Sequence, residues 1–180
     1  MIPQAFINEW QQLKVEINTR EHFAVLGLTK KVFEVKSLWF SQQAMTTTFH
    51  LEELLATKLR ALFQRKKGRD LFDLVVILKK FPDLDIEKML QSFKQYMAFD
   101  QTKVSRAEFE ANLAEKLNDE AFVKDIFPLL PSSIATGYQS SLDAAPYHPL
   151  NDVIHVQERI INRLPGGGWK GRDAANYQIE

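Results

Sequence analysis

Acidic and basic side chains gather on two adjoining stretches of the sequence, at spacings that suit phosphate chemistry. Asp70 and Asp73 lie three residues apart, so in a helix they would project from one side. Lys58 and Arg65 lie seven residues apart, which is about two helical turns, and would share a side of the preceding segment. A lysine acts on a phosphate as a point charge and an arginine as a two-pronged donor. Lys58 and Arg65 could therefore reach a triphosphate.

The same residues also have a purely structural explanation. Acids in the first turn of a helix are favoured by the helix dipole, so Asp70 and Asp73 could serve only to start one. Lys58 and Arg65 could be exposed or paired with acids. A buried ion pair between Asp70 and either cation would tie the two segments together without any catalysis. The residue types alone leave both explanations open.

Two amphipathic helices joined by a basic loop are expected to position these side chains. Apolar residues from Leu51 to Phe63 recur at helical spacing and form one stripe. A second apolar stripe runs from Leu71 to Leu78, and Pro82 ends that helix. Gly68 interrupts the pattern between them, as a C-terminal cap or a turn would. The sequence therefore predicts a helical hairpin around the loop 65–69.

Short strands are expected ahead of this hairpin. Residues 13–18 alternate apolar and polar side chains, which places Glu16 on the face opposite the core. Residues 31–36 are rich in β-branched and aromatic side chains, and residues 45–49 form a third, shorter candidate. Three or four such strands make a small sheet.

Further helices are expected after the hairpin, near 85–98, 105–117, 119–130 and 150–164. Asp85, Ser105 and Asp119 stand at the predicted starts as N-caps, and Glu108 would complete a capping box with Ser105. The fold class is therefore α+β, a small N-terminal mixed sheet followed by a helical bundle. The expected division is a β-rich part over 1–50, a helical part over 51–164 and a flexible tail over 165–180.

The composition excludes several classes of protein and site. The 180 residues contain 23 basic and 23 acidic side chains and no cysteine, which excludes disulfides, cysteine-based zinc sites and thiol nucleophiles. No stretch is apolar enough for a membrane span and the start does not look like a signal peptide, so a cytoplasmic protein is expected. Residues 58–80 carry a net charge of +6 and residues 81–130 a net charge of −4. Such a local excess of positive charge can attract phosphate.

The stretch LEELLATKLRALFQRKKGRDLFDL, residues 51–74, resembles the C-terminal motif region of the AbiEii/AbiGii family of nucleotidyltransferase toxins. Upstream, LKVEINTRE, residues 13–21, resembles the strand that carries the third acidic position of that family. The resemblance implies that the N-terminal sheet is a remnant of a nucleotidyltransferase fold. It implies transfer of a nucleoside monophosphate from an NTP to an RNA acceptor, with tRNA ends in some members, or to a protein. Family members commonly act as toxins beside a separate antitoxin.

The resemblance also implies roles for particular residues. Glu16 would be the third carboxylate, and so a metal ligand as well as a catalytic residue. Lys58 would contact the triphosphate, and Asp70 would be the essential acid of the second motif. These three are the predicted catalytic residues. Arg65, Arg69 and Asp73 would bind substrate beside them.

One motif of the family is missing from this sequence. The family binds Mg²⁺ and the nucleotide through a Gly-Ser pair followed by Asp-x-Asp, and no such segment occurs here. In the family it would precede residue 1, so the chain is expected to be a truncated open reading frame, a split gene product or a degenerate paralogue, and to be inactive alone. Mg²⁺ is then expected only where the missing motif is supplied. The expected partners are an NTP, an RNA or tRNA acceptor, an antitoxin or complementing chain, and a second copy in a homodimer, with no membrane. The alternative is a non-catalytic RNA- or protein-binding module derived from the fold.

Overall fold

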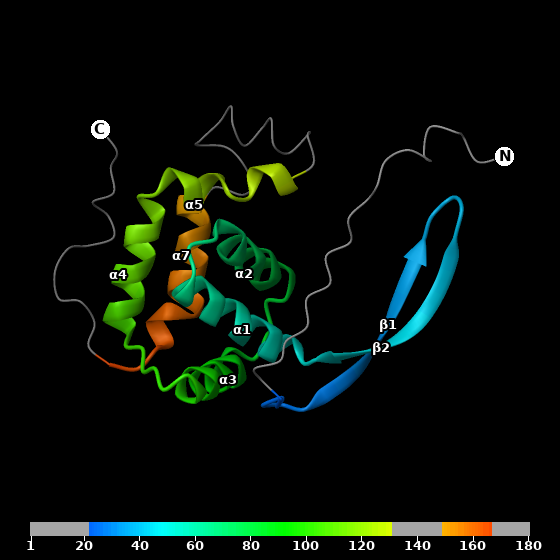
Figure 1. Cartoon of the computed structure of the whole chain (residues 1–180), viewed down its shortest axis with the longest axis horizontal. Coiled ribbons are helices and arrows are strands. Elements are labelled where there is room, and N and C mark those ends of the chain that lie inside the picture. Colours follow the sequence, from blue (N-terminus) through cyan, green and yellow to red (C-terminus); the bar gives the residue numbers. More distant parts are fainter. Residues whose placement is uncertain (1–21, 131–148, 167–180) are drawn as a thin grey trace.

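A computed structural model describes residues 22–130 and 149–166 of the chain, and these form an α+β fold, as predicted (Figure 1). The elements in chain order are β1 (Leu28–Lys36), β2 (Ser41–Phe49), α1 (Leu51–Gln64), α2 (Gly68–Lys80), α3 (Ile86–Phe99), α4 (Arg106–Leu117), α5 (Glu120–Lys124), η2 (Phe127–Leu129), α7 (Pro149–Arg159) and η3 (Ile161–Arg163). The strand predicted at 13–18, with Glu16, lies outside the described residues, as does most of the predicted tail. Among the described residues no helix is long and apolar enough to cross a membrane.

The two strands form an antiparallel hairpin that extends away from the helices (Figure 1). The pairing runs in register from Leu28 opposite Phe49 to Lys36 opposite Ser41. Both strands are longer than the predicted 31–36 and 45–49, because polar residues such as those at 41–43 join the ladder by backbone pairing. Most of the side chains on both faces are exposed. Burial does not mark these strand ends, so the side-chain pattern underestimated the strand lengths.

The helices enclose one hydrophobic core. The predicted stripe of α1 buries Leu55, Leu59 and Leu62, and that of α2 buries Leu74 and Leu78. Their partners come from later helices and include Met89, Leu90, Phe93, Phe109, Leu113, Phe122, Val156 and Ile160. Helices α1 and α2 are therefore held in place by packing against α3, α4, α5 and α7.

The predicted helix starts are confirmed. The side chain of Asp85 accepts a hydrogen bond from the Lys88 amide, and Ser105 forms the capping box with Glu108. Asp119 accepts from the Ala121 amide and so caps α5.

Two predicted helices are shorter than expected. The segment 119–130 contains the five-residue α5 and then the 3₁₀ turn η2, because Pro128 cannot continue an α-helix and disfavours helical geometry in the residue before it. The segment 150–164 likewise divides into α7 and the 3₁₀ turn η3, just ahead of Pro165. The prediction of one continuous helix over each of these ranges is therefore wrong for the C-terminal part of the range.

The prediction for Gly68 is also wrong in detail, because this residue opens α2 and does not cap α1. Helix α1 ends at Gln64 with Arg65 as its C-cap, and Lys67 is the N-cap of α2. A Cβ added at Gly68 would lie 2.0 Å from the carbonyl oxygen of Phe122. The absence of a side chain therefore lets the backbone of α5 press against the first turn of α2.

Replacing Gly68 by alanine is expected to lower the free energy of unfolding by about 1–3 kcal/mol, because the new methyl group meets a backbone oxygen that cannot rotate away. The effect opposes the helix propensity of alanine, which favours the substitution by about 1 kcal/mol. Urea denaturation followed by circular dichroism at 222 nm measures the change. Gln91→Ala, at an exposed position of α3, serves as the control and is expected to change little. An unchanged or raised stability of Gly68→Ala would contradict the close contact.

Candidate functional site

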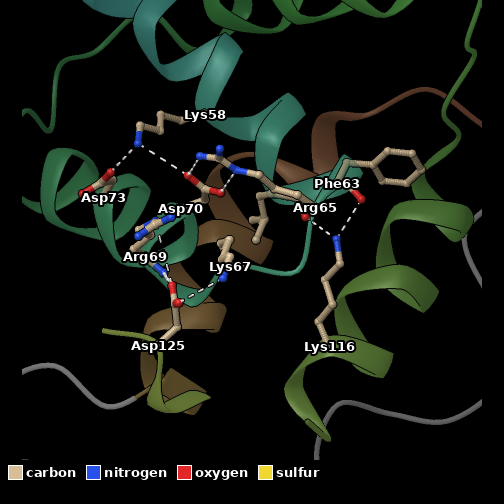
Figure 2. A network of polar contacts seen from close by, with 10 residues as sticks. Lys58, Phe63, Arg65, Lys67, Arg69, Asp70, Asp73, Lys116 and Asp125 are labelled. Carbon is tan, nitrogen blue, oxygen red and sulfur yellow. Dashed lines mark hydrogen bonds and ion pairs between the residues drawn. The ribbon is translucent and has the colours of Figure 1, made fainter. Parts of the chain in front are cut away.

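Helices α1 and α2 bring four of the predicted site residues together (Figure 2). We call Lys58, Arg65, Asp70 and Asp73 the Lys58 cluster. The Lys58 ammonium nitrogen lies 2.6 Å from Asp73 Oδ2 and 3.4 Å from Asp70 Oδ1, so two carboxylates of α2 hold a cation of α1. The side chain of Lys58 is 38% exposed, whereas that of Asp70 is fully buried. The ammonium group of Lys58 is therefore held by two carboxylates, while part of the side chain stays open to solvent.

Arg65 makes the strongest contact of the Lys58 cluster. Its Nε donates to Asp70 Oδ2 over 2.6 Å and its Nη2 to Asp70 Oδ1 over 2.7 Å, which is the parallel two-pronged geometry of an arginine–carboxylate pair. This hydrogen bonding raises the pKa of Arg65 above its ordinary value, against the opposing effect of burial. The buried charge of Asp70 is compensated by Arg65 and Lys58 together, so the ion pair that would tie the two helices is present.

Arg69 does not join the Lys58 cluster. Its backbone amide donates to Asp125 Oδ2 over 3.3 Å, and its side-chain Nε lies 4.0 Å from the same oxygen. Lys67 Nζ lies 3.7 Å from Asp125 Oδ1 (Figure 2). Lys66 Nζ lies 2.6 Å from Asp119 Oδ2, a contact that raises the pKa of Lys66 and lowers that of Asp119. The positive loop is therefore partly neutralised by acids that flank α5, within the segment that carries the net negative charge.

Two cations that the sequence pattern did not predict, the buried Lys116 and the half-buried Arg159, lie at the C-terminal ends of α1 and α2. Lys116 of α4 donates to the carbonyl of Leu62 and, over 2.7 Å, to that of Phe63 (Figure 2). Burial lowers the pKa of Lys116 to about 8. Arg159 of α7 donates to the carbonyl of Leu78 over 2.6 Å. Each cation satisfies carbonyls that a helix end leaves without a partner, and each favours the negative end of the helix dipole.

Glu53 is a fully buried carboxylate that the sequence pattern did not predict either. It accepts hydrogen bonds from the backbone amides of Val25 over 2.6 Å and Leu26 over 3.0 Å, and from the hydroxyl of Tyr96 over 2.6 Å. It therefore fastens the segment that leads into β1 to helices α1 and α3. The signal available in the sequence was its place beside the apolar stripe of α1, but its partners lie 27 or more residues away.

The described residues do not fit a metal ion. In residues 22–130 and 149–166 no group of three or more histidine or acidic side chains could hold one. Both oxygens of Asp70 accept from Arg65, and Asp73 is paired with Lys58. Glu16, the predicted metal ligand, lies outside the described residues. The chemistry that the Lys58 cluster offers is the binding of an anion such as a phosphate by an oriented ammonium group.

Comparison with known proteins identifies one family. A family model described as nucleotidyl transferase AbiEii toxin, type IV TA system, matches residues 2–146. No curated protein and no solved structure matches the chain.

Proposed function

Because the chain belongs to the AbiEii family of nucleotidyltransferase toxins of type IV toxin–antitoxin systems, we propose that the Lys58 cluster binds the triphosphate of an NTP. The bound NTP would donate a nucleoside monophosphate to an acceptor, either an RNA such as tRNA or a protein. The antitoxin that the family implies would be encoded as a separate partner. The observation that carries the proposal is that two carboxylates orient the ammonium group of Lys58, whose side chain is partly exposed to solvent.

The charge arrangement suits a phosphate-binding role. Nucleotidyl transfer leaves pyrophosphate, and cations placed in advance on the leaving phosphates stabilise the charge that develops there. Lys58 is such a cation, and Arg65 presents a half-exposed guanidinium beside it. Their positions do not depend on a bound nucleotide, because Asp70 and Asp73 already hold them. Asp73, predicted to bind substrate, then acts through the ammonium group it orients.

Asp70 is best described as a positioning residue. It is fully buried and both of its oxygens accept from Arg65, so it reaches a nucleotide only through the cations that it holds. Arg69 points to Asp125, and its predicted role in substrate binding rests on the family resemblance alone. The predicted roles of Glu16 rest on the same ground.

Magnesium belongs to this proposal only through residues other than those described. Mg²⁺ binds carboxylate oxygens and, when bound, neutralises charge on the phosphates. Glu16 and an Asp-x-Asp segment from outside these 180 residues, for example on a complementing chain, would hold it. The described residues orient the triphosphate but do not form the metal site. We therefore expect the 180 residues alone to bind NTP without transferring a nucleoside monophosphate.

Equilibrium binding of each of the four NTPs to the full chain tests the proposal, with titration calorimetry as the readout. Lys58→Ala is expected to weaken binding at least about tenfold, since a charged hydrogen bond contributes about 1.5–3 kcal/mol. Lys94→Ala is the matched control, because it removes an exposed lysine of α3 away from the Lys58 cluster. Absent NTP binding by the unmodified chain, or equal binding by Lys58→Ala, would overturn the proposal.

Transfer is measured in the same preparations with α-labelled NTP, Mg²⁺, total RNA and cell protein. Incorporated label that depends on Lys58 would show that the chain is sufficient by itself and would overturn the requirement for a complementing chain. Binding without incorporation would support that requirement.

A non-catalytic binding module is the second candidate, and the exposed hairpin of β1 and β2 favours it. Large apolar side chains at the tip, Leu38 and Trp39, are almost fully exposed, as they are in surfaces that contact another protein. The basic loop gives weaker support for RNA binding, because Lys66, Lys67 and Arg69 already face acids of the same chain.

A further inference from the structure

Within the part of the chain that the structure describes, the hairpin of β1 and β2 lacks the partners that a stable sheet needs. A two-stranded hairpin is marginal in water unless further strands or a helix cover it. In residues 22–130 and 149–166 the sheet has only these two strands, so one edge of β1 has no strand beside it in that part of the chain. Leu28, Val32 and Met45 are each more than half exposed. Leu28 lies opposite Phe49 and Val32 opposite Met45, so the four form an apolar group on one face.

We propose that β1 pairs antiparallel with β1 of a second copy of this chain, giving a four-stranded sheet across a twofold axis. The axis passes through Val32, the central residue of the nine-residue strand. The apolar row of Met45 and Val32 then continues into the same two residues of the second copy. Because the hairpin extends away from the helices and the paired strands run in opposite directions, the two helical bundles lie at opposite ends of the sheet (Figure 1).

Charge specifies this register. With full overlap about Val32, Lys30 lies opposite Glu34 of the second copy, and the twofold axis repeats the pair. Opposite charges directly across a strand pair are stabilising and like charges are destabilising. A slip by two residues in one direction would place Lys30 against Lys36, and in the other direction Lys31 against Lys31. Of these three registers, only full overlap pairs all nine residues of β1 and also places opposite charges across from each other.

The existing contacts of Glu34 are compatible with this pairing. Lys36 and Gln43 of the same hairpin lie 2.9 Å and 2.8 Å from Glu34, both at Oε1. These contacts lower the pKa of Glu34, so its carboxylate is charged at neutral pH. We assign Oε2 as the acceptor for Lys30 of the second copy. On the other face, the alkyl part of Lys31 lies opposite Phe33 of the second copy.

The molar mass of the full chain in solution tests the proposal, measured by sedimentation equilibrium from 1 to 100 µM (about the range in which dimers of this size dissociate). The expected species is a dimer of twice the 20.8 kDa chain mass. Lys30→Glu and Glu34→Lys are each expected to raise the dimer dissociation constant at least about tenfold, since each breaks two cross-strand pairs. The double variant that carries both changes re-forms the pairs with reversed sign and is expected to return to within about threefold of the original value.

Lys94→Glu is the matched control, because it makes the same change of charge at an exposed position of α3, outside β1. It is expected to shift the dissociation constant by no more than about threefold. Circular dichroism confirms that the helices of every variant remain folded. A monomer throughout the concentration range would overturn the proposal. It would do so even if another segment of the chain or another protein covers the edge of β1. A dimer whose double variant is not restored would also overturn it. Neither result depends on NTP binding, so the proposed function is tested separately.

Discussion

Replacing Arg65 by methionine is expected to lower the free energy of unfolding by about 3 kcal/mol, because it removes the main cation paired with a buried carboxylate, that of Asp70. Asp70 is fully buried and receives two hydrogen bonds from Arg65. Lys58 remains 3.4 Å away and offsets part of the loss, which places the expectation at the lower end for such pairs. Urea denaturation followed by circular dichroism measures the change.

Two controls separate the geometry of this ion pair from its charge. Arg65→Lys keeps a cation but loses the two-pronged contact, so about 1 kcal/mol of destabilisation is expected. Arg69→Met removes a half-exposed arginine with a side-chain contact of 4.0 Å and is expected to cost under about 1 kcal/mol. If Arg65→Met were no more destabilising than Arg69→Met, Arg65 would not be needed to compensate the buried charge of Asp70.

Glu53→Ala is expected to destabilise the protein by about 3 kcal/mol, because two backbone amides and a buried hydroxyl lose their acceptor. The amides of Val25 and Leu26 are expected to exchange with solvent deuterium at least about tenfold faster, which corresponds to a loss of about 1.4 kcal/mol of local protection. Hydrogen-exchange NMR measures the two amides, and urea denaturation measures the whole chain.

Glu52→Ala is the matched control for Glu53→Ala. Both acids lie in the first turn of α1 and interact equally with the helix dipole, but Glu52 is only half-buried. The control is expected to cost under about 1 kcal/mol and to leave the Val25 and Leu26 amides protected. Equal effects of the two substitutions would show that the helix dipole, and not the buried hydrogen bonds, explains the loss.

Local features of the sequence predicted the helical hairpin and its cluster well. Helical periodicity located α1 and α2, and the spacing of Asp70 and Asp73 predicted that both acids project from one side of α2, where both contact Lys58. Caps such as Ser105 with Glu108 were predicted correctly because the partners are three residues apart. In each case the interaction is decided within one or two turns of a helix.

The residues that the sequence did not reveal depend on distant partners. Lys116 lies three residues after Leu113 and seven after Phe109, so it shares a buried face of α4, but nothing local shows that the end of α1 lies against it. Asp125 faces the basic loop 56 residues earlier in the chain. Gly68 looked like a helix end because the close approach of α5 leaves no mark in the local pattern. The family resemblance assigned roles to Glu16 and Arg69 that the described residues do not test.

The caps on α1 and α2 also set an order of events during synthesis of the chain. Lys116 follows Leu62 by 54 residues and Arg159 follows Leu78 by 81 residues. At about 5–20 residues per second, a ribosome needs about 3–16 s to add segments of these lengths. For that interval the hairpin that carries Lys58 and Asp70 exists with both of its C-terminal ends uncapped. The hairpin therefore gains its two caps only after α4 and α7 have been synthesised, although every contact within the Lys58 cluster lies between α1 and α2.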